Sequence, residues 1–160
     1  MRMKALSILA ALLLVAGCSS DDTQTAAAGS GIAPVASTTG AIPGTQGDLN
    51  QTIGDRVFFD TDQYNLRPDA RATVDRWAAW MQQYPNVGAT IEGHADERGT
   101  REYNLALGDR RANAVRDYLV ALGIDASRVG TISYGKERPA NPGSSEQYWS
   151  QNRRSVMVVN

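Results

Sequence analysis

The sequence changes character near residue 48, and this change limits which part of the chain can fold into a packed domain. Residues 19–48 consist largely of Ala, Gly, Ser, Thr, Gln and Pro, and they contain no aromatic or basic residue. Such a segment cannot bury enough apolar area to offset the entropy lost when it becomes ordered. We therefore predict a flexible linker over residues 18–48 and one folded domain over residues 49–160.

The N-terminus has the pattern of a targeting segment. Arg2 and Lys4 precede an almost entirely apolar run from Ala5 to Ala16. This run is too short to cross a bilayer core of about 30 Å as a helix, but its length and flanks are typical of a signal peptide. We expect residues 1–17 to be a signal peptide that is removed.

The apolar run ends in Val15-Ala16-Gly17, directly before Cys18, the single cysteine of the chain. Small residues before a lone cysteine resemble a bacterial lipobox, which implies cleavage before Cys18 and its lipidation. The alternative is an ordinary signal peptide followed by an incidental free thiol. Ser19 follows the cysteine in place of Asp, which by resemblance points to the periplasmic face of the outer membrane.

The composition argues against several classes of protein. The chain has 16 Lys and Arg against 17 Asp and Glu, a net charge of −1, whereas nucleic-acid binders usually carry a strongly basic face. One His and one Cys are too few for a structural zinc site, which needs about four such ligands. We expect no nucleic-acid partner, no metal and no cofactor.

Hydrophobic periodicity predicts strands that alternate with helices over residues 49–160. The expected strands are Val57–Phe59, Val87–Glu92, Val129–Tyr134 and Ser155–Val159. The expected helices run from Pro68 to just before Pro85, over residues 101–122, and over about 145–151. This order predicts an α/β (α+β) two-layer sandwich with a βαβαβ core, a mixed sheet and an added C-terminal strand. We expect Trp77 and Trp80 in the core and Arg128 at the surface.

The long helix over residues 101–122 carries Arg111 inside its apolar stripe. Leu107 and Val115 lie one turn before and after it, and Asn104 lies on the same helix face. An arginine in such a position must be paired, because an unpaired buried charge is prohibitive. The candidate partners are acidic residues of two neighbouring loops: Asp60, Asp62, Asp96 and Glu97.

Two interpretations of this cluster remain open from spacing alone. In the first, Arg111 forms a structural ion pair that ties the helix to a loop. In the second, the cluster is a receptor for a zwitterion, in which the guanidinium binds a ligand carboxylate and an aspartate binds the ligand ammonium.

Six separated segments of the folded part resemble the OmpA C-terminal-like family. They are Gly93–Thr100, Glu102–Asn104, Leu107–Gly108, Arg110–Val115, Ser133–Pro139 and Asn152–Val156. The resemblance covers residues 55–160 and favours the receptor interpretation. It implies an OmpA-like fold that binds peptidoglycan without catalysis, its ligand being the diaminopimelate of the stem peptide, which carries a free amino-acid headgroup.

The resemblance also implies roles for residues at the matching positions. Asp96 would hold the ammonium group of the ligand and Arg111 its carboxylate, while Asn104 and Leu107 would line the pocket from the helix. The remaining residues would close the pocket from the end of the first strand and its rim: Asp60, Thr61, Asp62 and Arg98.

The same resemblance implies partners and a biological setting. The lipid on Cys18 would hold the outer membrane while the domain holds the peptidoglycan. TolB and other Tol proteins would bind the domain, in a system that maintains the envelope and constricts the outer membrane during cell division.

Two other classes of function remain as alternatives. One is a lipoprotein that only binds other proteins, which would have no need of Asp96 and Arg111. The other is a wall-cleaving hydrolase that uses paired carboxylates among the four acidic residues of the cluster. An adjacent arginine would lower the pKa of such carboxylates, which is the wrong direction for a general acid.

Overall fold

The structure is a computed structural model that describes residues 40–160. The predicted signal peptide, the lipidation site Cys18 and most of the predicted linker lie outside these residues. The elements are α1 (Gln46–Thr52), β1 (Arg56–Phe58), α2 (Pro68–Gln83), β2 (Ala89–His94), α3 (Arg101–Ala121), the 3-10 helix η1 (Ala126–Arg128), β3 (Val129–Gly135), α4 (Glu146–Asn152) and β4 (Arg154–Val159). Across residues 40–160, none of these helices has the length and apolarity needed to span a bilayer.

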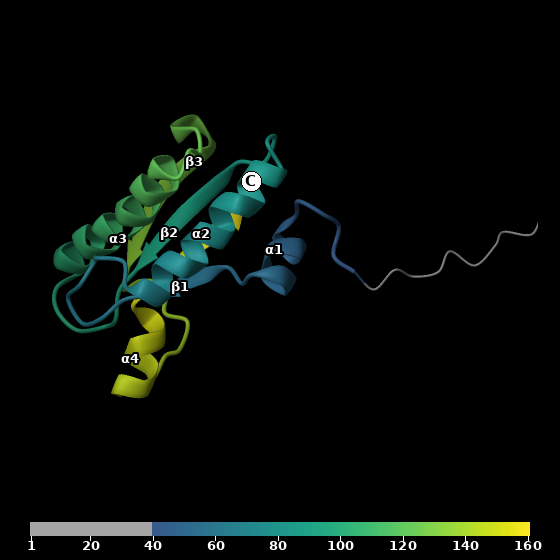
Figure 1. Ribbon diagram of the computed structural model, residues 1–160. Coiled ribbons are helices and arrows are strands. Elements are labelled where there is room, and N and C mark those ends of the chain that lie inside the picture. The colour runs from purple at the N-terminus through teal and green to yellow at the C-terminus, as the bar shows by residue number, and fades with distance from the viewer. Residues whose placement is uncertain (1–39) are drawn as a thin grey trace, which may run out of the picture. The chain divides into compact units, whose positions relative to one another are not determined.

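The four strands form one mixed sheet in the order β1-β4-β2-β3 (Figure 1). β2 and β3 are parallel, whereas β4 is antiparallel to both of its neighbours. The predicted mixed sheet and added C-terminal strand are thereby confirmed. β4 lies inside the sheet, because Ser155 pairs with Val57 on one side and with Gly93 on the other.

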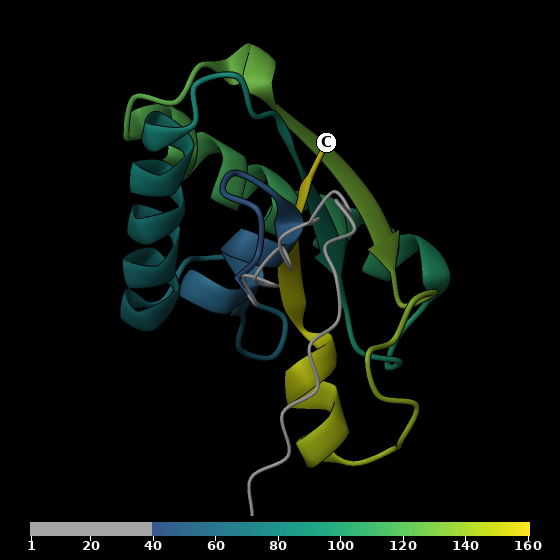
Figure 2. The same cartoon turned by 90° about the vertical axis from the view of Figure 1, so that its right-hand side faces the viewer.

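Helices α2 and α3 pack on one face of the sheet and enclose the core (Figure 1). Figure 2 shows α2 standing apart from the strands as a separate layer, with α4 beyond one end of the sheet. Trp77 of α2 is fully buried and Trp80 is 5% exposed, as predicted. Each large apolar side chain buried in this way stabilises the fold by about 1.5–3 kcal/mol.

The contact between α3 and β2 depends on two glycines. A Cβ atom on Gly93 would overlap the carbonyl of Gly108, and a Cβ atom on Gly108 would crowd Ser133 and the carbonyl of Gly93. The helix can therefore approach the strand closely at this point. The approach brings the first turns of α3 to the carboxyl end of β2, where most of the predicted site residues lie.

The structure departs from the sequence prediction at two element boundaries. The second strand is Ala89–His94, two residues later than expected. Helix α1 was not predicted, and it begins inside the segment assigned to the linker. Thr45 caps it by accepting a hydrogen bond from the Asp48 main-chain N–H, and Asp48 accepts one from the Gly44 N–H at 2.9 Å. The first of these bonds is an N-cap, and the second ties Asp48 to the residue before the cap, so ordered structure begins before residue 49.

Candidate functional site

Four of the eight predicted site residues meet at the carboxyl end of β2 and the start of α3. A pocket of about 240 Å³ lies there. Its lining comes from the loop after β1, the loop after β2 and the first turn of α3: Thr61, Asp62, Asp96, Arg98, Gly99 and Tyr103. Four of these residues were predicted from the sequence, whereas Gly99 and Tyr103 were not.

Asp96 is the acidic centre of this pocket, and its side chain is 9% exposed. Its Oδ1 atom accepts hydrogen bonds from the Arg98 main-chain N–H at 3.1 Å and from Arg98 Nε at 3.0 Å. Its Oδ2 atom accepts from Arg98 Nη2 at 2.7 Å and from Arg153 Nη1 at 3.4 Å. Two arginines therefore neutralise the carboxylate.

The same contacts set the protonation of Asp96. Burial by itself would raise the pKa of this carboxyl group. The hydrogen bonds and charge of Arg98, together with the hydrogen bond from Arg153, outweigh burial and lower the pKa below its ordinary value. Asp96 is therefore an anion at neutral pH, suited to hold a cation rather than to donate a proton.

Arg111 is fully buried, and its hydrogen-bond partners are main-chain carbonyls in place of the acidic side chains expected from the sequence. Its Nε donates to the Gln63 carbonyl at 2.8 Å, Nη1 to the His94 carbonyl at 2.8 Å and Nη2 to the Asp60 carbonyl at 3.1 Å. The interpretation of Arg111 as one half of a structural ion pair is therefore wrong. Its partners are main-chain carbonyls, and two of its five N–H groups have no acceptor within residues 40–160.

Arg111 lies beneath the loops that line the pocket. Its acceptors are the carbonyls of Asp60 and Gln63, on either side of Thr61 and Asp62, and that of His94, two residues before Asp96. Burial, then the charge of Arg153, lowers the pKa of Arg111 to about 10, while the charges of Asp96 and Asp62 act in the opposite direction. Arg111 therefore remains a cation at neutral pH, although it does not itself line the pocket.

Three other predicted residues have roles different from those expected. The Asp60 carboxylate is paired with Arg67 at 3.1 Å, on the side of a different pocket, and only its carbonyl contacts Arg111. Leu107 is buried and does not line the pocket. Asn104 is buried as well, and it donates to the carbonyl of Arg98 at 2.7 Å, so it shapes the loop rather than the pocket surface.

Thr61 and Asp62 close the pocket from the loop after β1, as predicted. Thr61 Oγ1 accepts a long hydrogen bond from Arg98 Nη2 at 3.4 Å. Asp62 has a φ of 57°, the one positive value among non-glycine residues in 40–160. Aspartate tolerates this left-handed conformation better than most residues, and the turn keeps the Asp62 side chain at the pocket.

Helix α4 and the residue after it supply two side chains that contact the pocket residues and whose roles sequence reasoning missed. Arg153, which follows α4, is almost fully buried and contacts Asp96 Oδ2, the Phe59 carbonyl at 3.1 Å and Glu146 at 2.5 Å. The ring of Trp149 lies 4.3 Å from the Arg98 guanidinium carbon. The sequence did offer one signal for Arg153: two adjacent arginines stand directly before an apolar strand. Arginines buried at such a position need polar partners in the protein.

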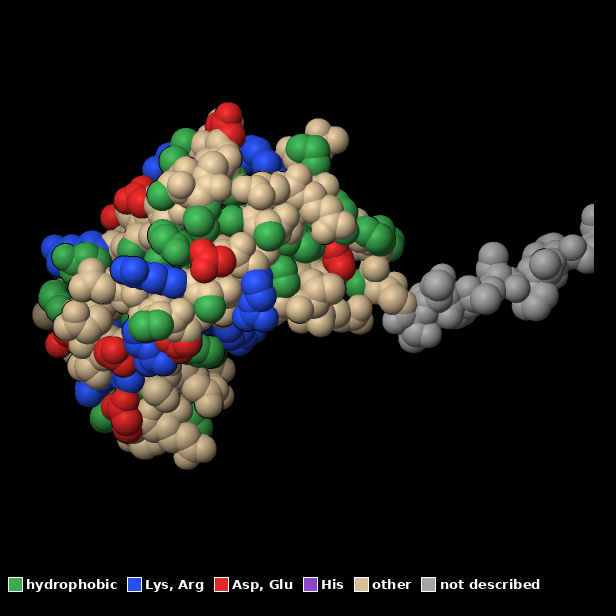
Figure 3. Space-filling view, viewed as in Figure 1, with side chains coloured by type: hydrophobic (Ala, Val, Ile, Leu, Met, Phe, Trp, Pro, Cys, Tyr) green, Lys and Arg blue, Asp and Glu red, His purple; other side chains and the backbone are tan. Residues whose placement is uncertain are grey.

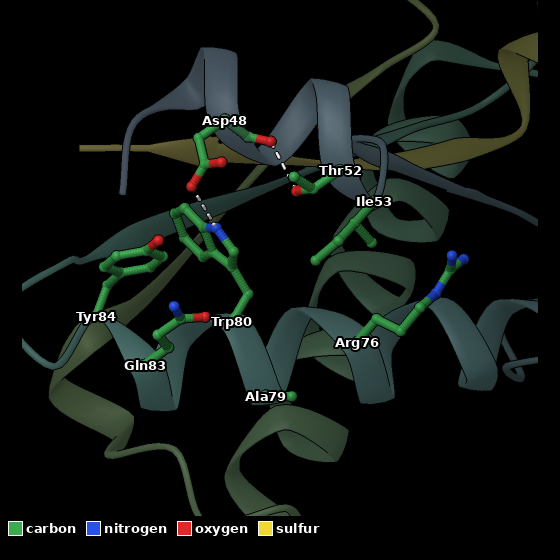
Figure 4. Close-up of a pocket in the computed structure, with 8 residues that line it drawn as sticks. All are labelled: Asp48, Thr52, Ile53, Arg76, Ala79, Trp80, Gln83 and Tyr84. Carbon is green, nitrogen blue, oxygen red and sulfur yellow. Dashed lines mark hydrogen bonds between the residues drawn. The ribbon is translucent and has the colours of Figure 1, made fainter. Parts of the chain in front are cut away.

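A larger pocket, of about 430 Å³, lies between α1 and α2 and contains none of the predicted site residues (Figure 4). Figure 4 shows Asp48 pointing at Trp80, whose Nε1 donates to the Asp48 carboxylate at 2.9 Å. The Trp80 ring also packs edge-on against Tyr84 at 5.1 Å. These contacts fasten α1 to α2, so we assign this pocket to the packing of α1.

The face of the molecule drawn in Figure 3 carries side chains of both charges. In the view of Figure 3, basic and acidic side chains are interspersed rather than gathered into regions of one sign. Within residues 40–160, no group of three or more His, Cys, Asp and Glu side chains is placed to hold a metal ion.

Comparison with known proteins identifies the family of the chain. The model of the OmpA family matches residues 58–153. A protein of Rhizobium meliloti (strain 1021) named peptidoglycan-associated lipoprotein is 55% identical over 148 residues, which is 92% of this chain and 82% of that protein.

Two solved structures share the fold. The crystal structure of the peptidoglycan-associated lipoprotein from Burkholderia pseudomallei has a TM-score of 0.65 at 40% identity, over 66% of this chain and 90% of that one. The C-terminal domain of Helicobacter pylori MotB has a TM-score of 0.62 at 22% identity, over 66% of this chain and 84% of that one. With its motifs, its sheet order and the family match over most of the folded part, the chain belongs to the OmpA family.

Proposed function

We propose that the domain binds peptidoglycan through the free amino-acid headgroup of diaminopimelate in the stem peptide. The observation that carries this proposal is the anionic Asp96 in the pocket, with the buried cation Arg111 beneath the loops that line it. Asp96 would take the ligand ammonium. The ligand carboxylate would take the two N–H groups of Arg111 that have no acceptor within residues 40–160, once ligand binding opens the loops that cover this side chain. The names of the relatives, peptidoglycan-associated lipoproteins, support peptidoglycan as the polymer that is bound.

The proposed activity is binding without catalysis. A hydrolase that uses paired carboxylates needs one of them protonated near neutral pH. The pKa of Asp96 is instead lowered, because the contacts with Arg98 and Arg153 outweigh its burial. The arrangement therefore suits a receptor for a zwitterion better than a site for acid catalysis.

The proposed role in the cell is that of a tether. Acyl chains on Cys18 would anchor the chain in the outer membrane, and two or more chains give stable anchoring. The domain would hold the peptidoglycan non-covalently on the periplasmic side. The intervening segment, residues 18–48 in the sequence prediction, would set the distance between the two layers.

We further propose that Tol proteins, TolB among them, bind the domain beside the pocket, as part of a Tol–Pal system that acts in outer-membrane constriction. Exposed Tyr103 and Leu105 at the start of α3 support such a surface. Tyr103 also lines the pocket, so TolB and the stem peptide would exclude each other. A soluble diaminopimelate tripeptide should then weaken TolB binding, and unchanged TolB affinity would contradict the overlap.

Sedimentation with insoluble diaminopimelate-type walls tests the wall-binding proposal. The full chain, purified in detergent, should sediment with the walls, and Asp96→Asn should weaken binding by tens- to thousands-fold, because one partner of a covered charge pair is lost. Asp117→Asn is the matched control, since its side chain is 73% exposed on the same helix as Arg111. Wild-type sedimentation of a folded Asp96→Asn variant would contradict the proposal.

A further inference from the structure

The acceptor capacity of the Asp96 carboxylate is already filled by groups of the protein. A carboxylate has about four acceptor positions. Arg98 occupies three of them through its main-chain N–H, Nε and Nη2, and Arg153 contacts Oδ2 as the fourth donor. A ligand ammonium therefore cannot bind Asp96 in this arrangement without displacing a donor.

The two arginines differ in how firmly they are held. The Arg153 side chain is 7% exposed, and it also contacts the Phe59 carbonyl and the Glu146 carboxylate. The Arg98 side chain is 39% exposed, and it has a long hydrogen bond to Thr61 as its other polar side-chain contact in the described chain. Arg98 is therefore the donor that a ligand would displace.

The main chain on both sides of Arg98 is fixed, so displacement would be confined to the side chain. Asn104 Nδ2 donates to the Arg98 carbonyl at 2.7 Å. Lys136 Nζ donates to the carbonyl of Glu97 at 3.1 Å and to that of Gly99 at 2.6 Å. The loop can keep its path while the Arg98 guanidinium moves.

Trp149 of α4 holds this guanidinium in place. Its ring lies 4.3 Å from the guanidinium carbon of Arg98, within the range of a cation–π interaction. Its Nε1 donates to Glu97 Oε1 at 3.0 Å, which orients the ring over the loop. One side chain of α4 thus contacts both residues that follow Asp96.

We propose that the Arg98 side chain is a gate on Asp96 that Trp149 holds closed, so that a ligand ammonium binds by displacing Arg98 from the carboxylate. This inference rests on the proposed function, because it is the ligand of that site that competes with Arg98. Trp149 is then a positioning residue: it touches no ligand, but it sets the affinity of the pocket from α4. By reciprocity, ligand binding weakens the contact of α4 with the loop.

Calorimetric titration with the soluble tripeptide L-Ala-γ-D-Glu-meso-diaminopimelate tests the gate in the full chain. Trp149→Ala should bind the tripeptide roughly two- to tenfold more tightly than wild type, because the closed state loses its cation–π contact. Trp149→Phe keeps an aromatic ring for Arg98, and its affinity for the tripeptide should lie between those of wild type and Trp149→Ala. Tyr148→Ala, which removes an exposed aromatic ring from the same helix, should bind like wild type.

The direction of the effect separates a gate from structural damage, since damage to α4 would weaken binding. Tryptophan emission adds a second readout: it should change on saturation of the wild type and stay constant in Trp149→Phe, since Trp77 and Trp80 are buried away from the pocket. Equal or weaker binding by Trp149→Ala, with wild-type binding intact, would overturn the gate alone. Absence of binding by every form would overturn the proposed function and the gate together.

Discussion

Arg111 Nη1 donates to the main-chain carbonyl of His94 at 2.8 Å, which ties the middle of α3 to the last residue of β2. The same guanidinium contacts the carbonyls of Asp60 and Gln63, in the loop after β1. One side chain therefore joins the three segments that form the pocket. Arg111 has a structural role whether or not a ligand is bound.

Replacing Arg111 with lysine should destabilise the fold. A single ammonium group cannot match the planar fork that reaches three carbonyls, and the loss of hydrogen bonds from a charged donor should lower the free energy of unfolding by about 2–4 kcal/mol. Urea denaturation measures this. Arg110→Lys, at the exposed neighbouring position, should be within about 0.5 kcal/mol of wild type. Equal stability of Arg111→Lys and wild type would refute the structural role.

The single histidine of the chain should titrate far below its ordinary range. Burial, followed by the charges of Arg154 and Arg138, lowers the pKa of His94 to about 4, although Glu92 Oε2 lies 3.6 Å from its Nε2. The unfolded chain binds this proton near pH 6.5, so between 6.5 and 4 the unfolded state holds more protons than the folded one. The contribution of neutral His94 to the free energy of unfolding is therefore complete above pH 6.5. It decreases by about 3 kcal/mol as the pH falls from 6.5 to about 4.

Proton NMR of the His94 ring checks this directly, because no other histidine contributes a signal. The resonances should stay those of a neutral ring down to about pH 5. A His94→Phe variant should lose less stability than wild type over the same window. A ring that titrates at its ordinary pKa would show that His94 is accessible to water.

Binding of the diaminopimelate tripeptide should not depend on mildly acidic pH. The contacts with Arg98 and Arg153 outweigh burial and lower the pKa of Asp96 below its ordinary value of 3.8. The carboxylate therefore stays charged as the pH falls from about 7 to about 5. Calorimetric affinities should agree over this range, and a steep loss of affinity by about pH 5 would contradict the role of Asp96 as the anionic partner.

Arg128 should matter for stability, although the sequence suggested an unimportant surface position. Its Nη2 donates to the carbonyls of Met81, Tyr84 and Val87 at 2.8–2.9 Å, and its Nε also contacts Val87. Arg128→Ala removes this donor from carbonyls in the last turn of α2 and in the segment after it, and should lower the free energy of unfolding by about 2 kcal/mol.

Urea denaturation of Arg128→Ala measures that loss. Arg101→Ala is the control, because its side chain is 71% exposed and its salt bridge to Glu137 should contribute little. If Arg128→Ala were as stable as Arg101→Ala, Arg128 would not stabilise the end of α2 as proposed.

Periodicity in the sequence was sufficient for most helices and strands, since it reports which face of an element is buried. It could not identify partners distant in the chain. Trp149 donates a hydrogen bond to Glu97, which lies 52 residues earlier in the chain. Arg111 donates to the main-chain carbonyl of Gln63, 48 residues earlier, and every residue has such a carbonyl, so the sequence cannot single it out. For the same reason the sequence did not show that the Asp60 side chain pairs with Arg67 instead of lining the pocket.

Helix α1 is a different kind of omission. Its start was visible as Thr45 followed three residues later by Asp48. The cap was overlooked because it follows a low-complexity segment and looks like part of it. The helix itself has only seven residues, which are too few to show a periodic apolar stripe. The buried Leu49 and the bond from Trp80 to Asp48 stabilise the helix through tertiary contacts that the local sequence does not display.

The most direct test of a receptor for a zwitterion compares two tripeptides that differ by one carboxylate. The full chain is titrated with L-Ala-γ-D-Glu-meso-diaminopimelate and with L-Ala-γ-D-Glu-L-Lys, which keeps the ammonium group but lacks the carboxylate assigned to Arg111. We predict that the lysine peptide binds at least tens-fold more weakly, because the guanidinium loses its charged partner. Equal affinity for the two peptides would contradict the pairing of Arg111 with the ligand.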